Sequence, residues 1–210
     1  PVLSNKQWIT ESVPLYINGE GTKVFSLETL FNHHSKSISH PKMTVEFTGN
    51  PGWYAVEALQ VLSNPKNEDA LSWATSYYAN ALTEHLAKTH PNLYSRFDMD
   101  TLAIRMNQAI RKLQDLQNEE GGWSWFKGMK GNRFMTTQIT ELLTRLQVMT
   151  GELTVDDKMQ KMYTRALTYL AKEAKEEYIS LTKEEKNGRT NIFPSEQVLH
   201  YLYICVLNGN

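Results

Sequence analysis

The chain lacks several features that would place it at once in a large protein class. It has a single cysteine, Cys205, among 210 residues, so an internal disulfide is excluded. Its longest apolar run, residues 201–207, is far shorter than the roughly 18 residues that span a bilayer. Acidic and basic residues are nearly balanced, 23 against 22. Such a balance gives no electrostatic footprint for nucleic acid or a membrane surface, so we expect no nucleic acid partner and no direct membrane insertion by this segment.

The remaining composition is that of an ordinary globular protein, with 40% hydrophobic and 21% charged residues. The length is sufficient to bury a core, and one domain with a smaller appendage is the expected organisation. The sequence starts at Pro1 without a methionine or a signal peptide, which favours a piece cut from a longer chain that could be exported. Cys205 lies in an apolar helical pattern, which favours a buried, inert thiol over a nucleophile.

The first 62 residues alternate short β-like runs with turn signals. VPLYI (13–17) and TKVFSL (22–27) flank the turn sequence NGEG, and MTVEFT (43–48) is a third strand candidate. Residues 53–62 fit either a continued strand or a short helix, and the helical interpretation is favoured toward their end. We therefore predict a β-rich segment over residues 1–62 that belongs to an adjoining β domain.

Residues 63–210 change to the 3.6-residue period of amphipathic helices, and the short connections predict antiparallel hairpins. The fourth expected helix has the most regular apolar stripe, from Tyr163 to Leu181, and the last is apolar nearly all round, which predicts its burial in the complete molecule. Start and stop signals give five helices. The first is opened by Asn64 and Pro65 and ends before Pro91, and the second is capped by Asp100 and ends at Gln117. The third ends at Gly151, the fourth begins near Thr154 and stops at Asn187, and the fifth opens at Ser195.

The connection between the second and third expected helices contains two glycines and two tryptophans, where a polar turn is usual. Gly121 and Gly122 permit left-handed or extended turn geometry. A tryptophan beside them can pack over the end of the preceding helix and offer its N–H to a carbonyl. Gln117 supplies a donor and an acceptor for the backbone groups left open at that end. We predict that Gln117, Gly121, Gly122, Trp123 and Trp125 form a structural clasp between the two helices.

The clasp sequence, QNEEGGWSW, resembles the Q-and-W repeat of α/α-toroid proteins. That group includes triterpene cyclases, protein prenyltransferase subunits and the thioester domain of the α2-macroglobulin and complement family. NPGWYAVEALQVL (50–62) and WATSYYANALTEHLAKTHP (73–91) are similar to bacterial α2-macroglobulin-like proteins of Bacteroidetes type, and VPLYINGEGTKVFSL is similar to their upstream β segment. The resemblance covers most of residues 8–150. It implies a mainly α fold, a partial α/α toroid of antiparallel helix hairpins over residues 63–210, with a short N-terminal β segment.

The reactive feature of that family is an internal thioester between the Cys and Gln of a Cys-x-Glu-Gln motif at the start of the first toroid helix. The resemblance places this motif at Asp69, Ala70, Leu71 and Ser72, where neither a cysteine nor a glutamine is present. A carboxylate and a hydroxyl cannot form that bond. We therefore expect no covalent-capture chemistry, no catalytic residue and no cofactor.

The histidines and acidic residues give weaker signals. His33, His34 and His40 have no zinc-site spacing and no cysteine beside them, so we expect a solvated loop and no metal. Short acidic pairs are interpreted as helix caps or solvated faces rather than as cyclase or glycosidase residues; they are Asp98 and Asp100, Asp156 and Asp157, Glu119 and Glu120, and the Glu84–His85 pair.

The resemblance implies a non-enzymatic domain of an exported, periplasmic or cell-envelope protein that traps or sterically blocks proteases without a thioester. Its partners would be other domains of the parent chain and target proteases. Two alternatives stay open, a carbohydrate-active toroid enzyme with its site in the central cavity and a surface-binding module with no inhibitory role. A cavity lined by several ionisable groups with shifted pKa values would favour the enzyme.

Overall fold

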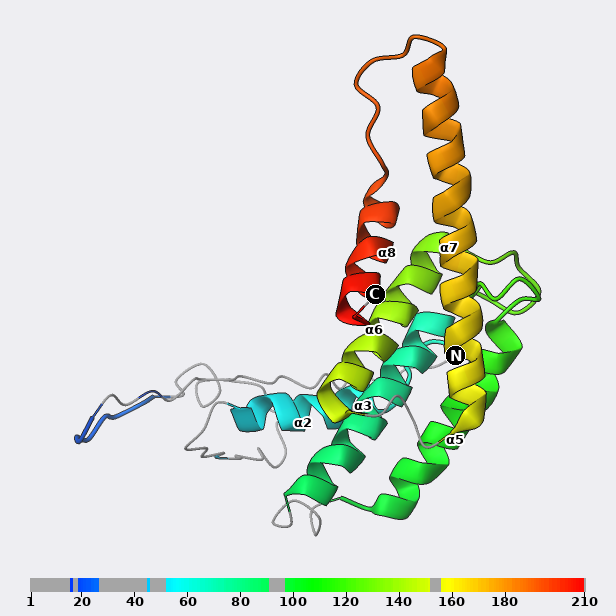
Figure 1. Cartoon of the computed structure of the whole chain (residues 1–210). Helices are drawn as coiled ribbons and strands as arrows, with labels where there is room; N and C mark the ends of the chain where they lie inside the picture. The colour runs from blue at the N-terminus through cyan, green and yellow to red at the C-terminus, as the bar shows by residue number, and fades with distance from the viewer. Residues whose placement is uncertain are drawn as a thin grey trace, which may run out of the picture. The chain divides into compact units, whose positions relative to one another are not determined.

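The structure is a computed structural model that describes residues 16, 19–26, 45, 52–90, 97–151 and 156–209 (Figure 1). The chain divides into two compact units, Pro1–Phe47 and Thr48–Asn210. The second unit contains six helices among its described residues: α2 (Gly52–Leu62), α3 (Ala70–Thr89), α5 (Met99–Leu116), α6 (Arg133–Thr150), α7 (Asp157–Lys186) and α8 (Glu196–Leu207). The prediction of a mainly α fold is confirmed.

The predicted β segment is not confirmed. Most of the residues in the strand candidates 13–17 and 43–48 lie outside the described residues. Residues 19–26 form neither helix nor strand, although Gly19 has the positive φ of 78° that a turn in NGEG requires. Residues 52–62 form α2, which packs on α3, so the helical unit starts before the predicted boundary at residue 62.

Polar side chains cap the N-termini of five helices, α3, α5, α6, α7 and α8, and two of these starts differ from the prediction. The first main helix begins at Ala70, because Asp69 accepts from the backbone N–H of Ser72 at 2.8 Å and from its hydroxyl at 2.8 Å. The turn around Asn64 precedes it. The second helix is capped by Asp98 rather than Asp100, because Asp98 accepts from the backbone N–H and the hydroxyl of Thr101.

The later helix boundaries lie close to their predicted signals. Asn132 caps α6, which ends at Gly151 with a left-handed φ of 76°. Asp156 caps α7, and the helix ends at Asn187. Ser195 caps α8 as expected.

The helical unit has two layers. From α3 to α8 successive helices alternate in direction, so α3, α6 and α8 run the same way and lie side by side in one layer (Figure 1). In the other layer α5 packs against α3, α7 packs against α6, and both run in the opposite direction. The core between the layers is continuous, and its largest fully buried aliphatic members include Leu113, Ile139 and Leu143.

Burial is uneven along α7 and α8, and the burial of α8 in the complete molecule stays a prediction. The apolar stripe of α7 is buried at Tyr163 and Leu170, but Tyr178 is 69% exposed. The C-terminal part of α7 extends beyond the start of α6 (Figure 1). In α8 only Ile204 is buried among the described residues. Cys205 is half-buried rather than fully buried. Burial, together with a hydrogen bond to the Cys205 thiol, raises the pKa of Tyr201 to about 12.

Candidate functional site

Gln117 ends α5 and joins it to α7. Its backbone N–H donates to the Leu113 carbonyl at 3.1 Å, which completes the last turn of the helix. Its side-chain Nε2 donates to the Gly121 carbonyl at 2.9 Å and to the Met162 carbonyl at 2.8 Å. Because Met162 lies on α7, one amide group fixes the connecting loop and α7 together. No catalytic group takes part in this arrangement.

Trp123 fills the space below the end of α5. Its side chain is 0% exposed, and its Nε1–H donates to the Leu113 carbonyl at 3.1 Å. Its backbone N–H donates to the Thr136 hydroxyl at 2.8 Å, and its carbonyl accepts from the Asn132 backbone at 2.8 Å. The tryptophan therefore connects the end of α5 to the start of α6.

The two glycines allow α7 to approach the loop closely. Gly121 has a φ of 95°, and a Cβ there would lie 2.4 Å from the Arg165 carbonyl oxygen. A Cβ on Gly122 would lie 2.9 Å from the nearest atom of the Tyr169 ring. Side chains of any size at these two positions would push α7 away from the loop.

Trp125 does not join the other four clasp residues. It is 39% exposed and precedes a tight turn in which the Met129 N–H donates to the Phe126 carbonyl at 3.2 Å. The structure thus brings Gln117, Gly121, Gly122 and Trp123 together around the ends of α5, α6 and α7. It leaves Trp125 on the exposed part of the loop.

Residues 69–72, to which the resemblance assigned the thioester motif, form a helix cap. Asp69 and Ser72 satisfy each other's polar groups at the start of α3, while Ala70 is fully buried. The next residue, Trp73, is buried in the core, and the Lys112 ammonium lies 5.3 Å from the centroid of its ring. These contacts anchor the start of α3.

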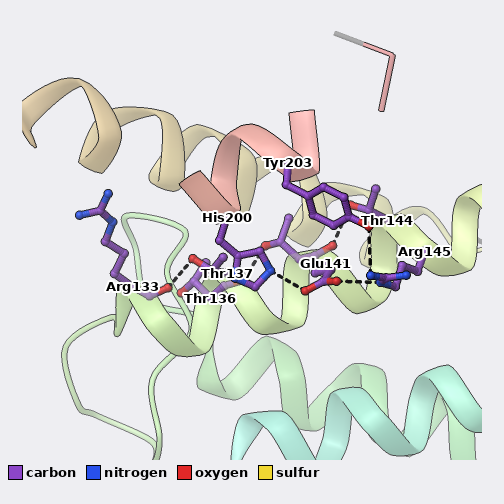
Figure 2. A network of polar contacts seen from close by, with 9 residues as sticks. Arg133, Thr136, Thr137, Glu141, Thr144, Arg145, His200 and Tyr203 are labelled. Atoms are coloured by element: carbon purple, nitrogen blue, oxygen red, sulfur yellow. Dashed lines mark hydrogen bonds and ion pairs between the residues drawn. The ribbon is translucent and has the colours of Figure 1, made fainter. Parts of the chain in front are cut away.

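A polar cluster that the sequence did not indicate lies between α6 and α8. We call it the Glu141 cluster, and it consists of Glu141, Arg145, His200 and Tyr203 (Figure 2). The Glu141 carboxylate lies 2.5 Å from His200 Nε2 and accepts from Arg145 Nε at 2.7 Å. Arg145 also donates to the Tyr203 hydroxyl at 3.1 Å, and its guanidinium lies 5.7 Å from the centroid of that ring.

The electrostatics of this cluster favour an ionised, fully paired carboxylate. Partial burial acts to raise the pKa of Glu141, but hydrogen bonds from Arg145 and His200 outweigh it, and the pKa lies below its ordinary value. On the neighbouring α3, partial burial raises the pKa of Tyr78. A carboxylate that is ionised and already paired is not a proton donor at neutral pH. The cluster holds α8 against α6.

Two further polar contacts fix the ends of α8. At its start, the Glu177 carboxylate on α7 accepts from the Ser195 N–H at 2.6 Å and from Arg133 at 2.5 Å. Burial acts to raise the pKa of Glu177, but the hydrogen bonds from Ser195 and Arg133 lower it overall. At its end, the Asn208 amide donates to the Tyr163 hydroxyl at 2.8 Å. Together with the Glu141 cluster, these contacts attach α8 at its start, its middle and its end.

Only part of this attachment had a sequence signal. Glu141 and Arg145 are four residues apart, the spacing of a helical ion pair. His200 is 59 residues from Glu141, and nothing local indicates that they meet.

The other acidic pairs serve as caps or lie on the surface. Asp98 and Asp156 cap helices, Glu84 pairs with Lys88 at 2.9 Å, and Glu120 lies 3.8 Å from Lys172. The histidines 33, 34 and 40 lie outside the described residues. Within the described part of the chain no group of three or more potential ligands could hold a metal ion.

Comparisons with known protein families, curated proteins and solved structures match none of them to this chain. Among the described helices none is long and apolar enough to cross a membrane.

Proposed function

We propose that this chain is the thioester-type domain, without its thioester, of a bacterial α2-macroglobulin-like protein. In this proposal it is a non-enzymatic module of a protease trap in the periplasm or cell envelope. Its partners are other domains of the parent chain and target proteases. Trapping then depends on cleavage of a bait segment elsewhere in the parent and on collapse around the protease.

The observation that carries the proposal is the way the clasp sequence is built into a two-layered helical unit. In an α/α toroid, inner helices run parallel to one another and outer helices return between them. Here α3, α6 and α8 form one parallel layer, and α5 and α7 return in the other. Gln117 and Trp123 lie at the passage from an outer to an inner helix and bond to α5, α6 and α7. This order is consistent with a toroid sector.

The start of α3 supports the non-covalent part of the proposal. Asp69 and Ser72 are engaged with each other as a cap, and neither can supply the thiol or the amide of a thioester. Cys205 lies on α8, in a different helix of the same layer. A trap built from this domain therefore holds its protease by steric enclosure.

The test uses the parent protein incubated with broad-specificity proteases. The expected result is loss of activity on a large protein substrate, retained activity on a small peptide substrate and one discrete cleavage of the parent. No adduct should survive a denaturing gel. Full activity on both substrates with general degradation of the parent would make the trap proposal wrong, and a denaturation-resistant adduct would contradict the non-covalent mechanism.

A pair of tryptophan variants makes the same assay specific to this domain. The parent carrying Trp123→Ala should be degraded instead of trapping, because the buried ring that joins α5 to α6 is lost. The parent carrying Trp125→Ala should trap normally, since that side chain lies on an exposed loop. Equal behaviour of the two variants would mean that trapping does not depend on the integrity of the helical unit.

The second candidate is a carbohydrate-active toroid enzyme, and the Glu141 cluster is the feature that bears on it. Two members of the cluster, Glu141 and Arg145, have shifted pKa values. Glycoside hydrolysis ordinarily uses two carboxylates, whereas this cluster has one, which is already paired. Turnover of a glycan panel that disappears in Glu141→Gln would favour the enzyme. Surface binding of glycans without turnover would favour the binding module.

A further inference from the structure

A polar pocket lies where the end of α2, the middle of α3 and the start of α5 meet. Its volume is about 330 Å³, at the small end of the range for ligand pockets. Its lining includes the amides of Gln60 and Asn64, the apolar side chains of Phe97 and Leu102, and one residue of each charge, Arg105 and Asp98. Neither the clasp nor the Glu141 cluster contributes to it.

The Arg105 side chain is held by a hydrogen-bond network centred on the buried residue Ser63. Its Nη1 donates to the Ser63 hydroxyl at 3.0 Å, and Ser63 is only 2% exposed. The same hydroxyl donates to the Gln60 carbonyl at 2.7 Å. The Ser63 carbonyl in turn accepts from the Ser76 hydroxyl at 2.6 Å and from the buried Asn80 amide at 3.1 Å. The guanidinium is therefore held in place before any ligand arrives.

In the described part of the chain, three arginines form ion pairs with glutamates, and Arg105 differs from them because its partner is uncharged. Arg133, Arg145 and Arg189 each form an ion pair with a glutamate. Among the described residues Arg105 forms none, and the hydroxyl of Ser63 is its hydrogen-bond acceptor. A guanidinium has five N–H donors in a planar fork that matches a carboxylate. Arg105 thus has donors available toward the pocket for an anion from outside.

Asp98 supplies the opposite charge. Hydrogen bonds from the Thr101 hydroxyl and backbone lower the pKa of Asp98, so the carboxylate is ionised at neutral pH. The positive charge of Arg105 also lowers the pKa of Asp98, although the two side chains form no ion pair. A pocket that presents separated positive and negative groups, with Phe97 and Leu102 beside them, is complementary to a small molecule that carries both charges.

We propose that this pocket binds a small zwitterion of the α-amino acid class, with its carboxylate on the Arg105 guanidinium and its ammonium group toward the Asp98 carboxylate. The amides of Gln60 and Asn64 provide further hydrogen bonds to the carboxylate. This binding is independent of protease trapping and of a glycan-processing activity.

The test titrates the 210-residue chain with single L-amino acids by calorimetry, alongside their carboxyl-amidated and N-acetylated forms. At least one amino acid should bind, and each modified form should bind more weakly. Arg105→Met should lower the affinity about tenfold to a hundredfold, the range for a lost hydrogen bond to a charged group. The matched control Arg111→Met removes an exposed arginine from the same helix and should bind normally.

The Asp98→Asn variant tests the role of the negative charge while Arg105 is kept. Asparagine caps helices as well as aspartate, so α5 should keep its start while the negative charge is lost. This variant should bind the free and the N-acetylated amino acid equally. The proposal is overturned if no amino acid binds at millimolar concentration, if Arg105→Met binds as tightly as the wild type, or if acetylation has no effect in the wild type. Circular dichroism of each variant verifies that the helices are intact.

Discussion

Trp123 and Trp125 are two residues apart and face opposite environments. Trp123 is 0% exposed with its indole N–H on the Leu113 carbonyl, whereas Trp125 is 39% exposed. The space below the end of α5 holds one indole ring, and the chain turns outward immediately afterwards. The pair therefore offers a matched comparison of a buried and an exposed tryptophan in one loop.

We expect Trp123→Ala to lower the free energy of unfolding by about 3–5 kcal/mol, the cost of removing a large buried aromatic side chain. Trp125→Ala should change it by less than about 0.5 kcal/mol, as for a surface substitution. Urea denaturation followed by far-ultraviolet circular dichroism measures both. Similar losses in the two variants would contradict the assignment of the clasp to Trp123.

Gly121 and Gly128 give a second matched pair, because both have positive φ, 95° and 86°, but different surroundings. Gly128→Ala should cost about 1–2 kcal/mol of stability, the strain of a side chain in a left-handed conformation. Gly121→Ala should cost about 1–3 kcal/mol more, because its Cβ would also overlap the Arg165 carbonyl. The same urea titration distinguishes them. Equal losses would mean that α7 does not pack tightly on the loop.

At the scale of the helix, α8 is attached in an unusual way. Its single buried residue is Ile204, while Leu199 and Val206 are 54% and 71% exposed. Apolar burial usually supplies most of the stability of a docked helix. Here much of the attachment comes from polar contacts to Glu177, Glu141 and Tyr163. The contacts to Glu177 and Glu141 depend on the ionisation of these carboxylates, so the docking of α8 should depend on pH more than the rest of the unit does.

We expect α8 to detach in acid before the core unfolds. Glu141 has a lowered pKa in the folded state, so its contribution is present above the ordinary value of 4.5 and is lost as the pH falls through the lowered one. Glu177 behaves in the same way. The charged and titratable groups that face Glu141 are Arg145 on α6, His200 and Tyr203 on α8, and Tyr78 on α3 through its proximity to Arg145.

Amide hydrogen exchange of α8 relative to α3, measured from neutral pH down to below pH 4.5, tests this expectation. Glu141→Gln should speed exchange in α8 about fivefold at neutral pH, equivalent to about 1 kcal/mol for a partly buried ion pair that solvent still screens. It should also weaken the acid dependence. Glu119→Gln, on an exposed turn, is the control and should leave α8 unchanged. Parallel acid responses of α3 and α8 would contradict a separately detaching helix.

Local sequence signals predict the helices well and their contacts poorly. The clasp could be predicted because its glycines, tryptophan and glutamine act within a few residues of one another. Trp125 was included because it has the same local surroundings as Trp123, and only packing distinguishes them. Asp98 and Asp100 both fit a cap, and the hydroxyl of Thr101 decides in favour of Asp98.

The longer-range features could not be predicted. Glu141 meets His200 across two helices that are far apart in the sequence. The exposure of α8 and of Tyr178 is equally a matter of where neighbouring helices end, because an apolar stripe indicates which face prefers burial and not whether a partner covers it.

At the scale of the whole molecule, the helical unit has the properties of an independent folding unit. Among the described residues its core cluster lies between Ala70 and Ala166, and the division of the chain falls after Phe47. We expect that a chain lacking residues 1–47 keeps the helical circular dichroism spectrum. Its free energy of unfolding should stay within about 0.5 kcal/mol of the value for the helical transition of the whole chain, as for a domain that has its own core.

Urea titrations of the two chains, followed at the same wavelength, measure this difference. Coincident midpoints with equal slopes would mean that the helical unit carries its own stability, since the slope reports the surface exposed on unfolding. A lower midpoint or a broadened transition in the shorter chain would show that residues 1–47 stabilise the helices, and the division at Phe47 would then not be a boundary between folding units. The comparison can be repeated with Trp123→Ala in both chains. If residues 1–47 do not affect the core, this substitution should lower the free energy of unfolding by the same amount in each chain.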